Sequence, residues 1–157
     1  MTRSLLLLAA IPLLFAAVGC EEEDNVCDGS LKSQYDMRFD RTRARQYQRS
    51  EQLAIEFLRG EDSSEEKPLI VTVHPLPEGP GSFTWDDNEV GVDSSLLPGR
   101  PELPELTSAE VQLDSFTPDE AEAEVQGSLH AMFTNTGSGD AFSLECRFKT
   151  KLEIMPL

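Results

Sequence analysis

Residues 142–154 read FSLECRFKTKLEI and carry the clearest structural signal in the chain. Every second residue from Phe142 to Ile154 is apolar or nearly so, and Ser, Glu, Arg and Lys occupy the positions between them. Because successive side chains of a β-strand point to opposite faces of the sheet, this alternation predicts a long strand with one buried face and one solvated face.

The preceding segment repeats the alternation. Residues 121–133 place small and apolar side chains on one face and mostly polar side chains on the other. The sequence NTGSGD at residues 135–140 lies between the two segments and consists of residues that favour turns. The two segments are therefore predicted to form a β-hairpin.

One pairing register satisfies both faces of this hairpin. It brings apolar residues together on one face, and it brings oppositely charged or hydrogen-bonding residues together on the other. The pairs are Phe133–Phe142, Leu129–Cys146, Gly127–Phe148, Glu124–Lys151 and His130–Glu145. Since the apolar and polar patterns agree on one alignment, the register is predicted along with the hairpin.

A helix over residues 118–133 is the alternative for the first strand. Thr117 suits a helix N-cap, Pro118 suits the first helical position, and apolar residues recur at helical spacing. Gly127 in the middle of the segment and the unbroken alternation favour the strand, and residues 117–120 equally suit a type I turn.

Further strands are expected along the rest of the chain. They cover Gln34–Asp40, Gln52–Arg59, Leu69–His74, Val111–Phe116 and a short stretch at Ser82–Trp85. Six prolines between Pro75 and Pro104 prevent regular structure throughout that stretch, which is expected to cross from one sheet to another. We therefore predict one all-β domain over residues 31–157, an antiparallel β-sandwich or partly closed barrel of about six to eight strands, with an α+β fold as the alternative.

The first nineteen residues have the features of an export signal. Arg3 precedes an apolar run from Leu5 to Val18, and Gly19-Cys20 follows. The run of about 14 residues is shorter than the roughly 20 that a membrane-spanning helix requires. Residues 1–19 are therefore interpreted as a removable signal peptide.

Ala17-Val18-Gly19-Cys20 resembles the lipobox of bacterial lipoproteins. The resemblance implies cleavage before Cys20, a diacylglycerol thioether on its sulfur and a further acyl chain on its new amino group, which together anchor the chain in a membrane. Glu21 after the cysteine resembles an outer-membrane address, so we expect a lipid-anchored location in the bacterial cell envelope. Residues 20–30 are interpreted as a lipidated acidic tether, and an ordinary secretory signal is the alternative.

Lipidation of Cys20 leaves two cysteines, Cys27 and Cys146, in an oxidising compartment. A disulfide between them is the candidate pairing. It would tie the tether to the last strand, and chain-entropy models give about 4–5 kcal/mol for a loop of this length. A buried free thiol at Cys146 is the alternative.

The charge of the chain excludes nucleic acid as a partner. Lys and Arg number 13 against 29 Asp and Glu, and the net charge of -16 repels phosphate backbones. The basic residues form two groups, one at Arg38, Arg41, Arg43, Arg45 and Arg49 and another at Arg147, Lys149 and Lys151. Each group indicates either a site for an acidic partner or a solvated strand face paired with glutamates.

The sequence carries no recognisable constellation for catalysis. His74 and His130 have no second ligand at metal-binding spacing, and nucleophile-elbow and phosphate-loop motifs are missing. The acidic stretch at residues 86–93 does not fit a calcium loop, because Val90 and Leu97 occupy positions that require oxygen donors. We expect a non-enzyme without catalytic residues, metal or cofactor.

The expected function is that of a lipid-anchored envelope domain that binds another envelope protein or a wall polymer. Contact is expected through the loop at residues 83–97 or through the arginine group. The candidate contact residues are Phe83, Trp85, Arg41, Arg43 and Arg45. Carriage of a small apolar ligand between two sheets is one alternative, and hydrolysis at a site assembled by the fold is another.

Overall fold

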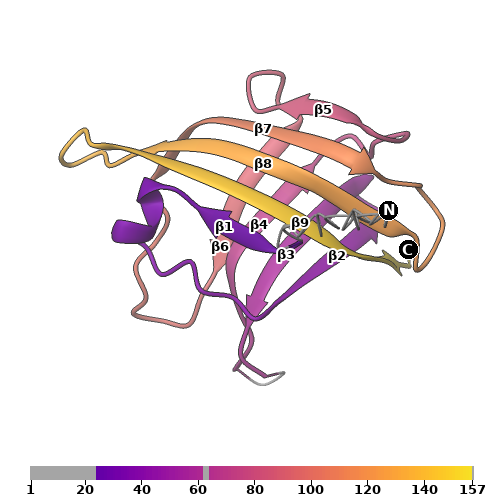
Figure 1. The fold of residues 1–157 in the computed structure, drawn as a ribbon, viewed down its shortest axis with the longest axis horizontal. Helices are drawn as coiled ribbons and strands as arrows, with labels where there is room; N and C mark the ends of the chain where they lie inside the picture. Colours follow the sequence, from indigo (N-terminus) through magenta and orange to yellow (C-terminus); the bar gives the residue numbers. More distant parts are fainter. Residues whose placement is uncertain (1–23, 62–63, 157) are drawn as a thin grey trace, which may run out of the picture.

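The computed structural model of the chain describes residues 24–61 and 64–156, and within them it contains nine strands and one 3-10 turn (Figure 1). In chain order these are β1 (Val26–Asp28), η1 (Ser30–Ser33), β2 (Arg41–Tyr47), β3 (Gln52–Arg59), β4 (Glu66–Val73), β5 (Gly81–Thr84), β6 (Val90–Ser95), β7 (Glu105–Ser115), β8 (Glu124–Thr134) and β9 (Ala141–Met155). The predicted all-β class is confirmed.

The strands form one sheet that curls into a nearly closed barrel. The order is β5-β7-β8-β9-β2-β3-β4-β6, and β1 adds to the edge of β9 that also carries β2. β5 and β6, at the two ends of this order, are joined by a tight turn in which the Glu89 N–H donates to the Thr84 carbonyl at 3.1 Å. Among the described pairs β2 and β9 run parallel and the other neighbours run antiparallel, so the predicted partly closed barrel is confirmed with one parallel pair.

The β8–β9 hairpin has the predicted register. All five predicted pairs occur, from Glu124 opposite Lys151 to Phe133 opposite Phe142. A Cβ atom at Gly127 would collide with the Gln112 carbonyl oxygen of β7 and lie 3.0 Å from the Phe148 ring. The helix alternative for residues 118–133 is therefore wrong, because this segment needs glycine for close strand packing and continues into the sheet.

Two segments, Gln34–Asp40 and β6, differ from the expectations. The strand predicted at Gln34–Asp40 is wrong, although Tyr35 and Met37 are buried as its alternation requires. Asp40 donates its backbone N–H to Leu58 of β3, but residues 34–39 join no strand ladder in the described part of the chain. β2 is one of the two structures that the sequence allows for the arginine group, a strand face paired with glutamates, whereas β6 forms where the sequence predicts an acidic loop. β6 forms because Val90 is buried against the core and Val92 packs beside it.

The start of the domain also lies earlier than residue 31. β1 pairs with residues 145–147 of β9, so Val26–Asp28 belong to the sheet and not to a free tether. The signal peptide at residues 1–19 and the first tether residues, 20–23, lie outside the described part of the chain.

The core fills the barrel with apolar side chains from both halves of the sheet. The largest fully buried ones include Phe57, Phe133, Phe148, Leu53, Leu69, Leu113, Leu129 and Leu152. Gln46 is also buried, and its amide exchanges two hydrogen bonds with Asp119, at 2.6 Å to the carboxylate and 2.9 Å from the backbone N–H. This exchange satisfies the buried amide and ties the turn before β8 to β2.

Candidate binding site

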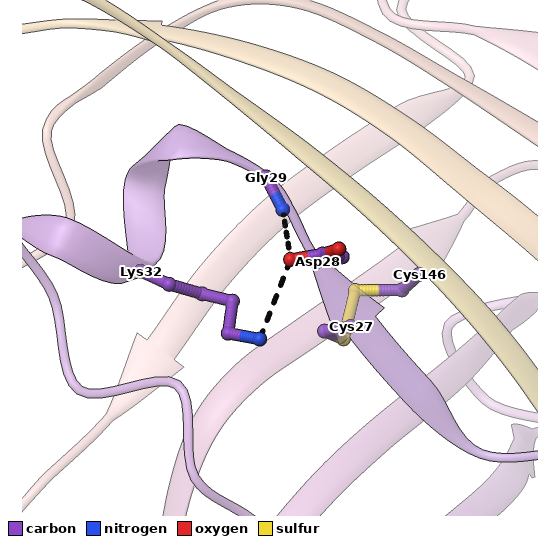
Figure 2. Close-up of a disulfide and its surroundings, with 5 residues drawn as sticks. All are labelled: Cys27, Asp28, Gly29, Lys32 and Cys146. Atoms are coloured by element: carbon purple, nitrogen blue, oxygen red, sulfur yellow. Dashed lines mark hydrogen bonds and ion pairs between the residues drawn. A yellow bond between two sulfur atoms is a disulfide. The ribbon is translucent and has the colours of Figure 1, made fainter.

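β1 is fixed to β9 by a disulfide and a short strand ladder. Cys27 lies directly opposite Cys146, and their sulfur atoms are bonded at 2.06 Å (Figure 2). The predicted disulfide is present, so the alternative of a free thiol at Cys146 is wrong. The link joins residues 119 positions apart and ties the first described strand to the last one.

Asn25 extends this attachment by one further position. The Lys149 backbone N–H donates to the Asn25 side-chain oxygen at 3.0 Å, and the Asn25 amide donates to the Lys149 carbonyl at 3.1 Å. The Thr42 hydroxyl of β2 also donates to that oxygen, at 2.8 Å. The Asn25 side chain thus fills the position on the edge of β9 between the part covered by β1 and the part covered by β2.

The chain leaves β1 through a turn that needs glycine. Gly29 has φ 120°, and a Cβ there would collide with the Ser143 carbonyl oxygen. Asp28 accepts hydrogen bonds from the Gly29 N–H at 2.9 Å and from Lys32 at 3.4 Å, which lower the pKa of its carboxyl (Figure 2). The turn directs η1 and the following extended segment back past β1.

A groove of about 720 Å³ lies between β1 and the segment at residues 32–39. We call it the β1 groove, and its lining includes Val26, Cys27, Lys32, Met37, Phe39 and Pro101. Six of its twelve lining residues are polar or charged, and the other six are apolar or aromatic. Its volume is within the range of roughly 300–1,000 Å³ that is typical of small-molecule sites.

The groove wall at residues 32–39 is held in place by contacts with β3 and β4. The Phe39 ring packs edge-on against Phe57 at a centroid distance of 4.9 Å. Tyr35 is buried, its hydroxyl donates to the Pro68 carbonyl at 3.1 Å, and burial raises its pKa. Sequence reasoning predicted a strand at Gln34–Asp40 and missed the groove. The alternation of Tyr35, Met37 and Phe39 is the one sequence signal of this wall.

One end of the β1 groove meets a charged cluster. Arg38 donates to both oxygens of Asp36 at 2.8 Å, and Arg59 lies 3.0 Å from the same carboxylate, so the pKa of Asp36 is far below its usual range. Arg59 also donates to the buried Glu66 at 2.6 Å, and the Arg100 guanidinium lies 3.2 Å from Glu66. Each guanidinium of this cluster is therefore paired with a carboxylate.

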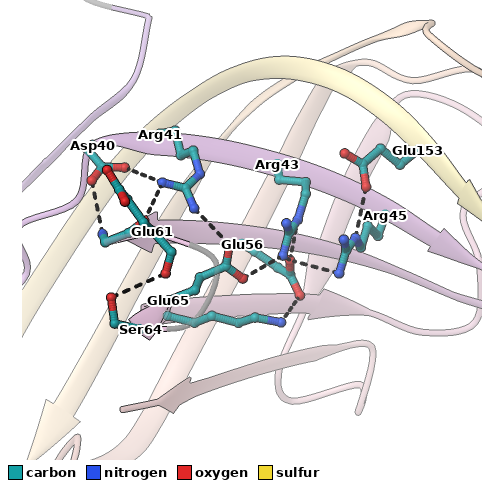
Figure 3. A network of polar contacts seen from close by, with 11 residues as sticks. Asp40, Arg41, Arg43, Arg45, Glu56, Glu61, Ser64, Glu65 and Glu153 are labelled. Atoms are coloured by element: carbon teal, nitrogen blue, oxygen red, sulfur yellow. Dashed lines mark hydrogen bonds and ion pairs between the residues drawn. The ribbon is translucent and has the colours of Figure 1, made fainter. Parts of the chain in front are cut away.

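The arginine group of β2 lies on the outer face of the barrel (Figure 3). Arg43 is 2.6 Å from Glu56 of β3, Arg41 is 2.8 Å from Glu65, and Arg45 is 3.0 Å from Glu153 of β9. Because all three guanidinium groups pair with glutamates of the same chain, this face has the pattern of the second interpretation, a strand face paired with glutamates.

Glu56 lies at the centre of this network. Its side chain is only 3% exposed and contacts Arg43, Arg45 and Lys67. Burial raises the pKa of Glu56, but hydrogen bonds from Lys67 and Arg43 outweigh that effect and lower it overall. The carboxylate is thus held charged in a buried position by its neighbours.

The other candidate contact residues lie elsewhere on the barrel. Phe83 of β5 packs against the core, and Trp85, in the turn between β5 and β6, is 39% exposed. The structure therefore does not bring them together with Arg41, Arg43 and Arg45 of β2.

The histidines occupy separate surface positions. His74 Nδ1 lies 3.1 Å from the Glu51 carbonyl, and His130 Nδ1 lies 3.8 Å from Glu145. Within residues 24–61 and 64–156 no three His, Cys, Asp or Glu side chains are arranged to hold a metal ion. No helix in this part of the chain is long and apolar enough to cross a membrane. Comparison of the chain with models of protein families, with curated proteins and with solved structures found no match.

Proposed function

We propose that this protein is a lipid-anchored component of the bacterial cell envelope, with a non-enzymatic barrel domain that binds an envelope partner. The resemblance of residues 17–20 to a lipobox supports the anchor. The observation that carries the proposal is the attachment of the first described residues to β9 by a disulfide, a strand ladder and the Asn25 side chain.

This attachment suits a domain that is held by its N-terminus. A pull on Cys20 would reach Asn25 and Cys27 first, and both are fixed to β9, which pairs with β8 along its other edge. The load would therefore be shared by a central strand and a covalent bond. A loosely attached N-terminal strand would instead peel away from the barrel.

The anchor is tested by the intact, non-reduced mass of the protein taken from its own membranes. We expect the mass of residues 20–157 with a diacylglycerol group and an acyl group, reduced by two hydrogens for the disulfide. Cys20→Ser should yield an unlipidated chain that no longer sediments with membranes, whereas Cys27→Ser should stay with them. A native chain that begins at Met1, or one without lipid, would overturn the proposal.

Partner contact is proposed at the turn that carries Trp85. Aromatic side chains dominate binding free energy at interfaces, and Trp85 is one of three exposed large hydrophobic residues in the described part of the chain. In-cell crosslinking of the native protein should yield an adduct that Trp85→Ala removes. Leu97→Ala is the matched control, because Leu97 is also exposed, at 46%, and lies beyond the far end of β6 from this turn. An adduct that survives Trp85→Ala would exclude this turn as the contact.

Carriage of an apolar ligand is a second candidate function, favoured by the β1 groove. The barrel interior is occupied by buried rings and leucines, so a ligand would bind in this outer groove and not between two sheets. Native mass spectrometry of the full lipidated protein tests this candidate, since a bound species should add to the protein mass. A protein mass without any addition would argue against carriage.

A further inference from the structure

We propose that the β1 groove is the docking site for the amide-linked acyl chain on Cys20 of the same molecule. This inference rests on the proposed lipidation of Cys20. It goes further in assigning the third acyl chain a place on the protein and not in the bilayer.

The groove offers the chemistry that an acyl chain requires. Val26, Met37, Phe39 and Pro101 contribute apolar lining, and Cys27 of the disulfide lines the groove with them. Lys32 and Arg38 stand at the rim, where both are already paired with Asp28 and Asp36. Among the described residues, the site therefore presents apolar side chains beside charges that are already paired, and no unpaired charge of its lining would select a charged ligand.

The point at which the described residues begin identifies the occupant. The described residues begin at Asp24, directly before Asn25 and Val26, which line the groove. Cys20 lies four residues before Asp24, and four residues span at most about 14 Å. An acyl chain on Cys20 is therefore attached within reach of the groove.

The exit of the chain is also fixed in place. Asn25 is held by Lys149 and Thr42, and Asp24 lies 4.0 Å from the Lys149 ammonium group. A short connection to a fixed point gives the acyl chain a high effective concentration at the groove. A free lipid from the bilayer lacks this advantage.

Docking of one chain leaves the anchor intact. Two acyl chains are enough for stable attachment to a membrane, so the two chains of the diacylglycerol group can hold the protein alone. Each CH₂ group that leaves water for the bilayer or for apolar groove lining is stabilised by the hydrophobic effect. The third chain can therefore exchange the bilayer for the groove at little cost and would hold the domain against the membrane surface.

Photocrosslinking of the full lipidated protein in its own membranes tests this assignment. A benzophenone amino acid replaces Phe39 in one variant and the more exposed Lys32 in a second, so that a folding defect at Phe39 does not decide the outcome. We expect a crosslink within one molecule between the probe and the lipid-bearing Cys20 peptide, identified by mass spectrometry after digestion. A probe at Met132, outside the groove lining, is the control and should not give it.

A matched pair of proline variants sharpens the test. Pro101→Asp puts a charge into the groove lining and should lower the crosslink yield about tenfold, which corresponds to about 1.4 kcal/mol of docking free energy. Pro98→Asp changes an exposed residue of the same loop outside the lining and should leave the yield unchanged.

The possible results separate the two proposals. Crosslinks to phospholipid alone, or no lipid crosslink in a chain whose mass shows acylated Cys20, would overturn the docking of the acyl chain and leave the proposed anchor standing. A chain without lipid on Cys20 would overturn both.

Discussion

The side chain of Asn25 acts as a strand residue beside Lys149. It accepts a hydrogen bond from the Lys149 N–H at 3.0 Å and donates one to the Lys149 carbonyl at 3.1 Å, as a backbone neighbour in a sheet would do. This pairing explains how one edge of β9 serves two strands. β1 runs antiparallel to its first part and β2 runs parallel to its last part, and Asn25 closes the interval between them.

Asn25→Ala should lower the free energy of unfolding by about 1 kcal/mol. The substitution removes the two hydrogen bonds that the Asn25 side chain makes with the Lys149 N–H and carbonyl. Because this site is exposed, water can replace part of these bonds. Urea unfolding of the mature chain measures the change. Gln34→Ala, a truncation of another exposed amide in the same N-terminal region, should change stability by less than about 0.5 kcal/mol. Equal effects of the two substitutions would contradict the special role of Asn25.

Reduction of the Cys27–Cys146 disulfide should lower the free energy of unfolding by about 4 kcal/mol. The bond closes a loop of 119 positions, so its loss increases the conformational entropy of the unfolded chain. Urea unfolding with and without a reducing agent tests this expectation. The Cys27→Ala, Cys146→Ala double variant is the control, because the reducing agent should leave its unfolding midpoint unchanged. A wild-type midpoint that does not respond to reduction would contradict the prediction.

Gly127→Ala should destabilise the barrel by about 1–3 kcal/mol. The added Cβ would meet the Gln112 carbonyl of β7 and press on the Phe148 ring, so β7 and β8 would have to move apart. Thermal unfolding followed by circular dichroism measures the effect. Gly79→Ala is the matched control, since no atom lies within 4 Å of the Cβ position there. A Gly127→Ala protein as stable as the Gly79→Ala protein would show that these strands are not closely packed.

Acid should unfold the protein through its paired glutamates. The pKa values of Glu56, Glu65 and Glu66 are lowered in the folded chain from an ordinary value of 4.5. Groups with a lowered folded pKa stabilise the fold above the unfolded pKa, and this contribution is lost as pH falls through the folded pKa. The free energy of unfolding should therefore be constant near neutral pH and fall steadily below about pH 4.5. A flat profile down to pH 3 would contradict this account.

Glu56→Gln should remove part of that acid dependence and cost about 3 kcal/mol at neutral pH. The substitution leaves Arg43 and Lys67 without the carboxylate that lies 2.6 Å from each of them. Urea unfolding at neutral pH and at pH 4 separates the two effects. Glu145→Gln is the control, because the Glu145 side chain is 68% exposed and its loss should change stability by less than about 0.5 kcal/mol.

The amino-acid sequence alone was enough to predict the hairpin of β8 and β9 and its register. Its apolar and polar residues alternate without interruption, so side-chain burial and charge pairing both specify one register, and the structure has that register. The cysteine count was likewise enough to identify Cys27 and Cys146 as partners once Cys20 was assigned to a lipid. These features depend on local periodicity and on composition, which a single sequence displays directly.

The tertiary structure decided which strand edges meet. The alternation at Tyr35, Met37 and Phe39 is that of a strand, but residues 34–39 join no strand ladder in the described part of the chain and form a wall of the β1 groove. The charged sequence of β2 does not indicate that it is a central strand of the sheet. It can occupy that position because Glu56, Glu65 and Glu153 pair with its outward arginines. Period-two alternation shows which face of a segment is buried, whereas hydrogen-bonded strand edges and buried ion pairs depend on residues far apart in the chain. Only the folded barrel could therefore show the parallel β2–β9 pair, the position of Glu56 and the β1 groove.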